Sequence, residues 1–428
     1  MLFLALACID ATSYRAPPDD AVSSDATSPA VAPTNLIVIG FDTLRADRIG
    51  AYGGGDLTPN LDAVLSESLL LDDHRSCSNW TFGALTCLWA GAYGEDIGFV
   101  PQGSYAQPSP APEDLTTVPR WLRKKRDFTT ALVGASPWFG DDWNLTEGFG
   151  VRLTQSNADA EEVIGWVGDI APTLGQEGNA WMLQVHLIDP HMPFDAPREY
   201  WDGVDLEMAE DYSLATTEGI NEAIDDYDRL GPVDQERLLQ YFDDIYDAEV
   251  RWTDERFGEL WDTLDDAGVL DDAVVVFWSD HGEQFYEHGD WAHGKTLHAE
   301  ETRALGALWA PGLAAQTWTE PTSVIDLLPT ALDWMDKEAP SFVTGVPAGE
   351  ASPKRPRYLV QGADDRTLQG VDVENLRLIY SWEDGMSLFD IDEDPEELND
   401  LWKPNEDGYS AIVELLEAQG AKLEPLMR

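Results

Sequence analysis

Two short apolar runs, each ending in an aspartate, limit the possible folds more than any other feature of the sequence. NLIVIGFD covers residues 35–42 and AVVVFWSD covers residues 273–280. Continuous apolar runs rich in β-branched residues are typical of parallel strands buried on both faces. Similar runs occupy 130–136 and 180–189, and segments with helical periodicity lie between the runs, among them 58–69 and 241–268. This alternation predicts an α/β fold with a doubly wound, mostly parallel sheet flanked by helices.

The sequence divides into three parts. Residues 1–34 begin with MLFLALAC, which is similar to the end of a bacterial lipoprotein signal with Cys8 as the lipidated residue, and continue as a tether rich in Pro, Ala, Ser and Asp. Residues 35–350 hold the α/β pattern, and the acidic interval at 198–232 indicates a surface insertion. Residues 351–428 show short strands and then a helix from about 408, which predicts a small C-terminal α+β subdomain.

The charge balance excludes some partners. The chain carries 81 acidic and 26 basic residues, a formal net charge of −55. This charge repels nucleic acids and anionic membranes, so we expect no nucleic-acid partner, and membrane association only through a lipid at Cys8. With the signal-like start, it predicts a protein of the bacterial cell envelope or another extracytoplasmic compartment. Solubility explains the acidic surface, with adaptation to a salty medium as the alternative.

The histidines are clustered, and the cysteines are few. Six of the seven histidines fall within residues 184–194 and 279–298. Histidine is a common metal ligand and proton carrier near neutral pH, so this clustering predicts a reaction site. Three cysteines do not form a disulfide framework, and we expect Cys77 and Cys87 to be packing residues.

A metal site is predicted where two strands end. Asp42 and Asp280 are the last residues of two predicted strands, and His281 follows directly. In open α/β sheets, ligands bind outside the carboxyl ends of the strands. Two carboxylates and an imidazole there would suit one divalent cation, with Ca²⁺, Mg²⁺, Mn²⁺ and Zn²⁺ all possible. The alternative is that each aspartate caps a helix or a surface turn.

Several segments together resemble the sulfatase family of the alkaline phosphatase superfamily. They are NLIVIGFDTLRADRIGAYG with TPNLD, DPHMPF, SDHGEQFYEHG with HGK, and SLFDIDEDPEELNDL, in the order and approximate spacing of the family, over residues 35 to about 402. The resemblance implies a metal-dependent ester hydrolase. It implies that Asp42, Asp280 and His281 hold one metal ion, with the nucleophile as the fourth ligand.

The resemblance also implies roles for residues around the metal. Lys295 in HGK matches a family lysine that contacts the transferred group, where a fixed cation stabilises negative charge. His191 in DPHMPF matches a histidine near the leaving-group oxygen, which is suited to general acid catalysis. His293 is expected to support one of these two residues, and Arg45 is a further candidate for substrate binding. His186 and His74 are expected to be structural.

The nucleophile position departs from the family pattern. The family motif CxPSRxxLxTG places Thr81 where the family has a cysteine that becomes formylglycine, and it places Gly83, Ala84 and Leu85 at the Pro, Ser and Arg. Threonine cannot form an aldehyde hydrate, but its alkoxide on a metal can attack a phosphoryl group. Phosphatase and phosphotransferase branches of the superfamily are similar in this respect. The alternative role of Thr81 is a helix N-cap.

These observations leave several functions open. We prefer hydrolysis of phosphate esters through Thr81, and the alternatives are a sulfuric ester hydrolase and a catalytically silent metal-binding protein. A transferase that builds envelope polymers would use Thr81 equally well. A Lys and His that many sulfatases carry are replaced by ASPWFGDDWN, which removes two positive groups from the pocket. The expected substrate is a small-molecule, glycan or lipid ester.

Overall fold

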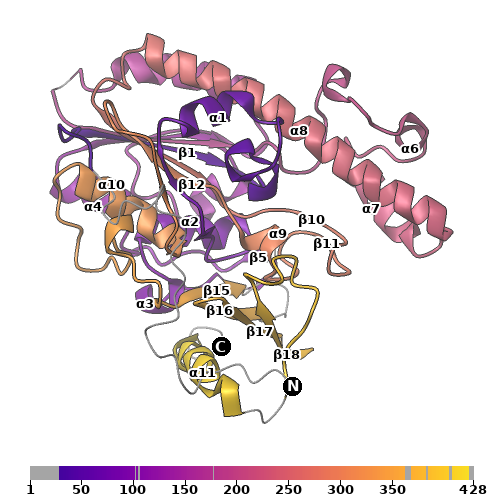
Figure 1. The fold of residues 1–428 in the computed structure, drawn as a ribbon. Helices are drawn as coiled ribbons and strands as arrows, with labels where there is room; N and C mark the ends of the chain where they lie inside the picture. The colour runs from indigo at the N-terminus through magenta and orange to yellow at the C-terminus, as the bar shows by residue number, and fades with distance from the viewer. Residues whose placement is uncertain are drawn as a thin grey trace.

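A computed structural model describes residues 28–101, 103–104, 107–176, 178–361, 368–381, 384–403 and 407–423. Cys8 and most of the predicted tether lie outside these ranges. Within them, no helix is both long and apolar enough to cross a membrane. The fold is the predicted one, a mostly parallel sheet between helical layers with a small C-terminal subdomain below it in the view of Figure 1.

The central sheet has eight strands, and β12 alone runs against its neighbours. The four apolar runs identified in the sequence form adjacent strands at its centre, in the spatial order β9, β1, β8 and β6. In sheet order the strands are β13 (Gln316–Trp318), β2 (Leu69–Leu71), β12 (Gly306–Trp309), β9 (Ala273–Ser279), β1 (Asn35–Phe41), β8 (Trp181–Leu187), β6 (Thr129–Ala135) and β7 (Val151–Gln155).

Helices cover both faces of the sheet, which explains the uninterrupted apolar strands. Ile37 and Ile39 of β1 pack in one core, whose helices are α1 (Pro59–Leu65), α5 (Ala160–Ile170) and α8 (Pro232–Asp266). Leu36 and Val38 point into the second core, whose helices are α2 (Thr81–Ala90), α4 (Val118–Lys125) and α10 (Leu327–Trp334). Successive strand residues point to opposite faces, so a strand between two cores is apolar throughout.

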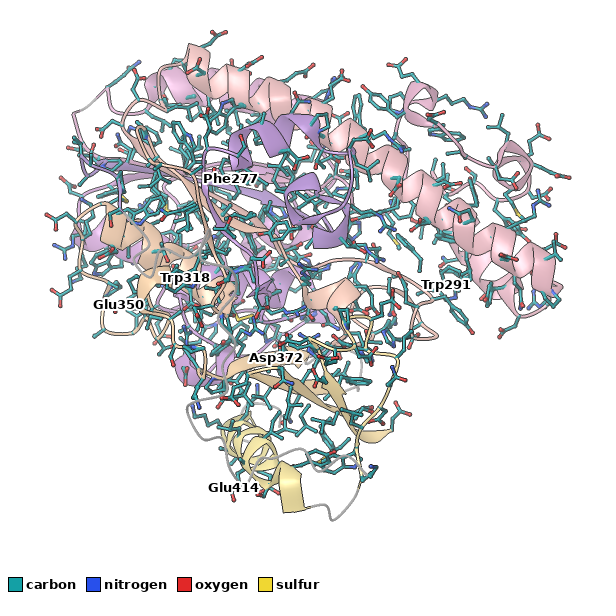
Figure 2. The ribbon with its side chains drawn as sticks, viewed as in Figure 1. Phe277, Trp291, Trp318, Glu350, Asp372 and Glu414 are labelled. Carbon is teal, nitrogen blue, oxygen red and sulfur yellow. A yellow bond between two sulfur atoms is a disulfide. The ribbon has the colours of Figure 1, made fainter. Side chains whose placement is uncertain are left out.

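The acidic insertion is more regular than its sequence suggests. It contains the helices α6 (Leu206–Asp211) and α7 (Thr217–Tyr227), which lie with the N-terminal half of α8 in an arm that projects from the sheet (Figure 1). Asp205 and Thr216 begin these helices by accepting hydrogen bonds from backbone N–H groups. Trp291 lies beside this arm (Figure 2), and its ring packs against Tyr227 and Phe242.

The C-terminal subdomain is an antiparallel sheet with one helix. Its elements are β15 (Arg357–Gln361), β16 (Leu368–Val373), β17 (Leu376–Ser381), β18 (Gly385–Asp390) and α11 (Ser410–Leu423). Asp372 lies on this sheet (Figure 2) and pairs with buried Arg377. Arg377 also pairs with Glu397 and donates to the carbonyl of Leu297, which ties the sheet to the larger domain. The remaining short elements are β3 (His74–Arg75), α3 (Gly94–Ile97), β4 (Gly103–Ser104), β5 (Gln107–Pro108), β10 (Gln284–Phe285), β11 (Trp291–Ala292), α9 (Ala299–Thr302) and β14 (Thr322–Ser323).

The expectation of two free, packing cysteines is wrong. Cys77 and Cys87 form a disulfide that joins the loop before α2 to the second turn of that helix. Thr81 lies inside the closed loop. The sequence separation of 10 residues allows a bridge, but cysteine spacing alone does not distinguish a local disulfide from two buried thiols.

Removal of this disulfide should destabilise the fold. The chain-entropy relation gives about 3 kcal/mol for a loop of this length. We therefore expect the double variant Cys77→Ala/Cys87→Ala to lose about that much free energy of unfolding in urea denaturation. Cys8→Ala, which leaves the bridge intact, is the control. Equal midpoints for the double variant and the parent chain would contradict a stabilising bridge.

Several buried carboxyl groups have a raised pKa because burial outweighs the effect of nearby positive groups. Burial raises the pKa of Asp189 to about 7, with Asp195 as a second cause, and burial raises the pKa of Glu300 to about 8. Burial also raises the pKa of Glu249 and of Glu301 well above the ordinary value. These groups hold protons in the folded chain at a pH where unfolded carboxyls have lost them.

The free energy of unfolding should therefore fall as the pH rises from about 4, the ordinary carboxyl pKa, to about 8. In that interval the folded state binds more protons than the unfolded state, so raising the pH favours unfolding. Melting temperatures measured across the interval test this. Repulsion within the acidic chain acts in the same direction, so Glu300→Gln is the control that isolates one group. Its melting curve should depend less on pH, and an unchanged slope would contradict the assignment.

Candidate metal and catalytic site

The two acidic strand ends lie side by side. Strands β1 and β9 are parallel neighbours with Phe41 opposite Ser279, so the next residues, Asp42 and Asp280, leave the sheet together at its carboxyl edge. The backbone N–H of Asp280 donates to the carbonyl of Phe41 at 3.3 Å, which continues the ladder to the site. Both carboxylates are buried, with 1% and 0% of their residue surface exposed.

Asp42, Asp280 and His281 form a cluster that fits a metal ion. One ligand atom from each lies within 4.8 Å of the other two, and this is the only such group of three or more among the described residues. The N–H groups of Thr43 and His281 donate to Oδ1 of Asp280 at 3.0 and 2.8 Å, whereas its buried Oδ2 has no hydrogen-bond partner. A divalent cation would satisfy this oxygen.

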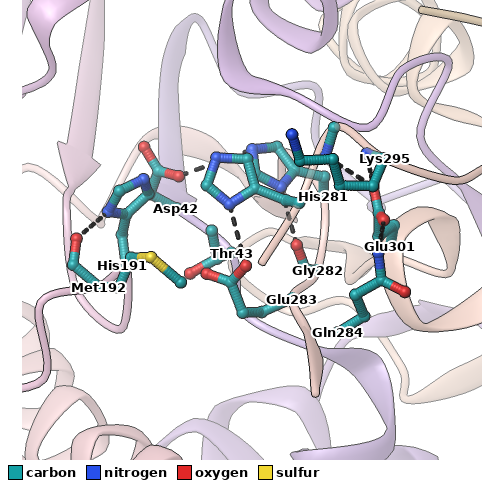
Figure 3. Close-up of polar contacts among 12 residues, drawn as sticks. Asp42, Thr43, His191, Met192, His281, Gly282, Glu283, Gln284, Lys295 and Glu301 are labelled. Atoms are coloured by element: carbon teal, nitrogen blue, oxygen red, sulfur yellow. Dashed lines mark hydrogen bonds and ion pairs between the residues drawn. The ribbon is translucent and has the colours of Figure 1, made fainter. Parts of the chain in front are cut away.

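The imidazole of His281 is turned toward the carboxylates. Its Nδ1 lies 2.9 Å from the carbonyl of Gly282 (Figure 3), so Nδ1 carries the proton and Nε2 is the free ligand atom. This Nε2 lies 3.7 Å from Oδ1 of Asp42 and 3.5 Å from Oδ2 of Asp280. The orientation suits metal ligation by neutral histidine.

The pKa values of the two carboxyl groups are shifted in opposite directions. Burial raises the pKa of Asp280 to about 7, and the nearby charge of Asp42 adds to the shift. Burial acts in the same sense on Asp42, but His191, His186 and His281 outweigh it and hold the pKa of Asp42 well below its ordinary value. Two like charges in one buried space are costly, and a bound cation would offset both.

Thr81 lies against this cluster as the first residue of α2. Its Oγ1 is 3.5 and 3.4 Å from the two carboxylate oxygens of Asp42 and 3.4 Å from Nε2 of His281. Trp80, with an extended backbone, occupies the N-cap position. The alternative prediction that Thr81 caps the helix is therefore wrong, and its hydroxyl remains available to the predicted metal site.

Packing explains two departures from the nucleophile motif. A Cβ at Gly83, where the motif has Pro, would lie 2.4 Å from Oγ of Ser78, whose hydroxyl donates to the carbonyl of Val360. Leu85, where the motif has Arg, is fully buried in the second core. All ten residues of the helix that carries Thr81 are buried, so its position is fixed by packing.

His191, His293 and Lys295 come from two loops near the metal ligands. The His293 ring centroid lies 4.6 Å from that of His281 and 5.0 Å from that of His191. His191 hydrogen-bonds the carbonyl of Met192 through Nδ1 (Figure 3), which leaves its Nε2 as the other site for a proton. The structure thus places His191 and His293 beside His281 of the Asp42, Asp280 and His281 cluster.

Two buried glutamates that the sequence analysis did not single out hold the loop that carries His293 and Lys295. Oε1 of Glu283 lies 3.0 Å from Nδ1 of His293. Glu301 accepts hydrogen bonds from the backbone N–H groups of Gly294, Lys295 and Thr296, at 2.7, 3.2 and 3.0 Å. Their partners lie 5 to 10 residues away in sequence, in loops without periodicity, so no local pattern reveals the contacts.

Arg45 does not join this group. Its guanidinium pairs with Asp47 and Glu287 and donates to the carbonyl of Glu283 at 2.9 Å. These contacts engage all three of its nitrogens. Substrate binding by Arg45 stays a prediction. The ion pairs of its guanidinium with Asp47 and Glu287 do not favour it.

The segment that replaces the expected Lys and His forms an aromatic wall. Trp138 stacks on Phe82 with ring centroids 5.5 Å apart, and it meets Trp80 and Trp143 edge to face at 5.5 and 5.4 Å. Trp80 and Phe82 flank Thr81 in the sequence. These rings pack on the helix that carries Thr81, in the segment where the family has two positive groups.

His186 lies inside a strand, as expected, and its ring also contacts Asp42. It lies on β8 with no exposed surface, and its Nε2 is 3.5 Å from Oδ2 of Asp42. Gly134 and Gly40 are its partners on the neighbouring strands, and a Cβ on either would collide with His186 at 3.0 Å or less. Glycine inside a buried strand often marks a close approach, so Gly40 and Gly134 are the sequence signal for this histidine.

The other histidines stay away from the metal ligands. His74 is buried, and its Nδ1 lies 3.0 Å from Oγ1 of Thr322, in agreement with a structural role. His288 and His298 stack with ring centroids 3.6 Å apart, and Nδ1 of His298 contacts Glu397 of the C-terminal subdomain at 2.6 Å.

The contact with His186 should matter for metal affinity. An imidazole beside Oδ2 of Asp42 restricts the rotation of a ligating carboxylate, and loss of such outer partners weakens metal binding about 10- to 100-fold. We expect calorimetric titration with Mn²⁺ to show a loss of this size for His186→Ala. His74→Ala removes an equally buried ring far from the site and serves as the control. Equal affinities of all three proteins would contradict this role.

Comparisons with known proteins agree with the geometry. A profile of the Sulfatase family matches residues 34–337. Choline-sulfatase of Rhizobium meliloti is 30% identical over 247 residues, which cover 52% of this chain and 46% of the relative. N-acetylglucosamine-6-O-sulfatase of Bacteroides thetaiotaomicron is 22% identical, with 86% of this chain and 82% of the relative covered. The chain thus spans about half the length of the first relative and most of the second.

Solved structures share the fold. The structure of BT4656 with its substrate D-glucosamine-2-N,6-O-disulfate has a TM-score of 0.72 at 18% identity, covering 92% of this chain and 98% of that one. The phosphonate monoester hydrolase of Silicibacter pomeroyi has a TM-score of 0.66 at 18% identity, covering 91% and 94%. The profile matches more than half of the chain, and the chain therefore belongs to the sulfatase family.

Proposed function

We propose that the protein is a metal-dependent hydrolase of phosphate esters that uses Thr81 as its nucleophile. The observation that carries the proposal is the position of the Thr81 hydroxyl, within 3.5 Å of both Asp42 and His281. One divalent ion, held by Asp42, Asp280, His281 and the Thr81 oxygen, would lower the pKa of the hydroxyl and offset charge on the phosphoryl oxygens. The donor set suits several such ions.

The protein residues divide the remaining work. Oγ1 of Thr81 forms a bond to phosphorus as the bond from phosphorus to the ester oxygen breaks, and His191 gives a proton to that oxygen. Water then attacks the phosphothreonine and gives a proton to His191, and the Thr81 oxygen leaves and regains its proton from His293. Glu283 fixes the tautomer of His293, which lies between His191 and His281 and can take the proton of the hydroxyl. Lys295 would neutralise charge on the transferred group.

The surroundings favour a substrate with few negative charges. The aromatic wall of Trp138 and Trp143 replaces positive groups, and the chain as a whole carries a net charge of −55. Both features disfavour a polyanionic glycan. A small-molecule ester, or a glycan or lipid ester with one charged group, fits better.

A sulfuric ester hydrolase is the second candidate. It is favoured by the names of the relatives, which include choline-sulfatase and N-acetylglucosamine-6-O-sulfatase. It requires Thr81 to replace formylglycine, and threonine cannot release sulfate by collapse of an aldehyde hydrate. A phosphonate monoester hydrolase with the same fold supports phosphorus chemistry on this scaffold. Transfer to another alcohol in place of water, and a silent metal-binding role, are the remaining alternatives.

The proposal extends to the compartment. Disulfides persist mainly in oxidising compartments, so the Cys77–Cys87 bridge supports an extracytoplasmic location. Lipidation of Cys8 would hold such a protein at a membrane surface. The test of this anchor is combined below with that of a surface on the folded domain.

Hydrolysis of matched nitrophenyl esters tests the function. We expect the metal-loaded protein to hydrolyse a nitrophenyl phosphate or phosphodiester, with turnover lowered at least about a thousandfold in Thr81→Ala. Thr81→Ser, which keeps a hydroxyl, should retain part of the activity. Thr86→Ala is the matched control, because Thr86 lies on the same helix and its hydroxyl only contacts the carbonyl of Phe82. Turnover of the sulfate alone would overturn the mechanism, and no turnover of any ester would support a silent site.

A further inference from the structure

One helix carries a concentration of positive charge that the average composition hides. Residues 120–126 read RWLRKKR, so five of the 26 basic residues occupy seven positions at α4 and its C-terminal end. Arg123, Lys124, Lys125 and Arg126 are exposed, and Arg120 is half-buried. Lys337 adjoins them, with its Nζ 5.6 Å from the ring centroid of Phe128. We call these six residues the basic surface.

The basic surface is not neutralised by the surrounding acids. In the described part of the chain, none of the five cations of 120–126 forms an ion pair, whereas Arg45, Arg48, Arg256 and Arg377 are each paired with at least two carboxylates. Asp127, Asp336 and Glu338 are the exposed acids next to these residues in the sequence, and Arg120 donates to the backbone carbonyl of exposed Glu113. Five cations within seven positions are a local excess of positive charge in a chain where acids outnumber bases three to one.

The helix also carries an aromatic anchor. Trp121 is half-buried, and the guanidinium of Arg126 lies over its ring at 4.7 Å. The other face of α4 is apolar, with Val118 and Leu122 in the second core. Exposed Lys and Arg beside a Trp are typical of helices that lie against lipid headgroups.

The basic surface lies at the end of the sheet where the parallel strands begin, which is also where the tether enters the domain. The tether reaches the domain at Thr34, whose N–H donates to Asp272 at 3.0 Å, and Asn35 begins β1. Asn35 accepts a hydrogen bond from the N–H of Trp181, which is the register partner of Thr129, three residues beyond Arg126. Two strand spacings, about 10 Å, thus separate the start of β1 from the strand that follows the basic helix.

The catalytic site lies at the opposite end of the sheet, where the strands β1 and β9 end. Asp42 and Asp280 follow the last residues of β1 and β9, and each of these strands has seven residues. Seven residues of strand span about 23 Å. A surface that contacts the tether edge therefore leaves the metal site on the far side of the sheet.

We propose that the basic surface docks the protein on an anionic lipid bilayer, with its catalytic site facing away from that bilayer. Charges farther apart than about 8 Å are screened at physiological ionic strength, so the local surface and not the net charge decides the contact. Each basic residue at an anionic membrane contributes about a fivefold gain in binding. The basic surface would supply a contact with the bilayer in addition to any lipid at Cys8. The substrate then arrives from the aqueous side.

Vesicle binding by the full-length chain tests this inference. Cys8→Ser is used throughout, so that no acyl chain contributes, and vesicles contain equal parts of phosphatidylglycerol and phosphatidylethanolamine. We expect sedimentation with these vesicles at low salt, release by high salt, and no binding to phosphatidylcholine. Replacement of residues 123–126 by four glutamines should lower the partition coefficient about a hundredfold or more.

A charge-matched control separates local from net charge. Arg152, Arg229, Lys354 and Lys422 are cations elsewhere, each in an ion pair, and changing all four to Gln alters the net charge by the same amount. This control should bind as the parent does. Lys124→Gln/Lys125→Gln is a milder second variant in case the fourfold change alters the circular dichroism spectrum. Equal losses in control and surface variants, or no binding by the parent, would overturn the proposal. Self-association without vesicle binding would also overturn the proposal, because the basic surface would then contact a second copy of the chain and not a bilayer.

Fractionation of cells separates the two signals. Cys8→Ser alone should release part of the protein from membranes, and combination with the surface variant should release the rest. Unchanged membrane association of the Cys8→Ser protein would contradict the lipid anchor. Complete release by Cys8→Ser alone would contradict a second signal from the basic surface. Neither outcome depends on catalytic turnover.

Discussion

The parallel register of β1 and β9 is the constraint on which the rest of the site depends. It makes Asp42 and Asp280 leave the sheet together, and burial then makes two adjacent carboxylates costly unless a cation lies between them. The backbone fixes one oxygen of Asp280 through two N–H groups, and three histidines surround Asp42. The sheet therefore brings together a cluster of residues that fits a metal ion.

The central sheet and the metal cluster could be predicted because their signals are local. A buried parallel strand is a short apolar run, and its last residue marks the carboxyl edge, so Asp42, Asp280 and His281 could be grouped without coordinates. The helices of the insertion were missed because their apolar faces are short and interrupted by acids. The glutamates that hold the catalytic loops, and His186 behind Asp42, depend on contacts across the fold that leave no periodicity.

The distribution of charge over the surface, more than the net charge, decides which surfaces the protein can contact. The net charge of −55 predicts repulsion from anionic surfaces, yet five cations gather at residues 120–126, without ion pairs among the described residues. Screening limits the reach of each charge to about 8 Å at physiological ionic strength, so two edges of one sheet can have opposite electrostatic character. An average over the sequence cannot resolve such a separation, whereas the order of strands in the sheet does.

The changes around Thr81 form a packed unit. Gly83 gives room to Ser78, Leu85 fills the core where the motif has a charge, and Phe82 stacks on Trp138 in the segment that lacks the expected Lys and His. A decaying site would be expected to leave cavities and unpaired polar groups at the replaced positions, because no selection would refill them. Here Leu85 is fully buried in the second core, and Phe82 stacks on Trp138. The helix that carries Thr81 is thus held by its packing in a position where the Thr81 hydroxyl lies within 3.5 Å of Asp42 and His281.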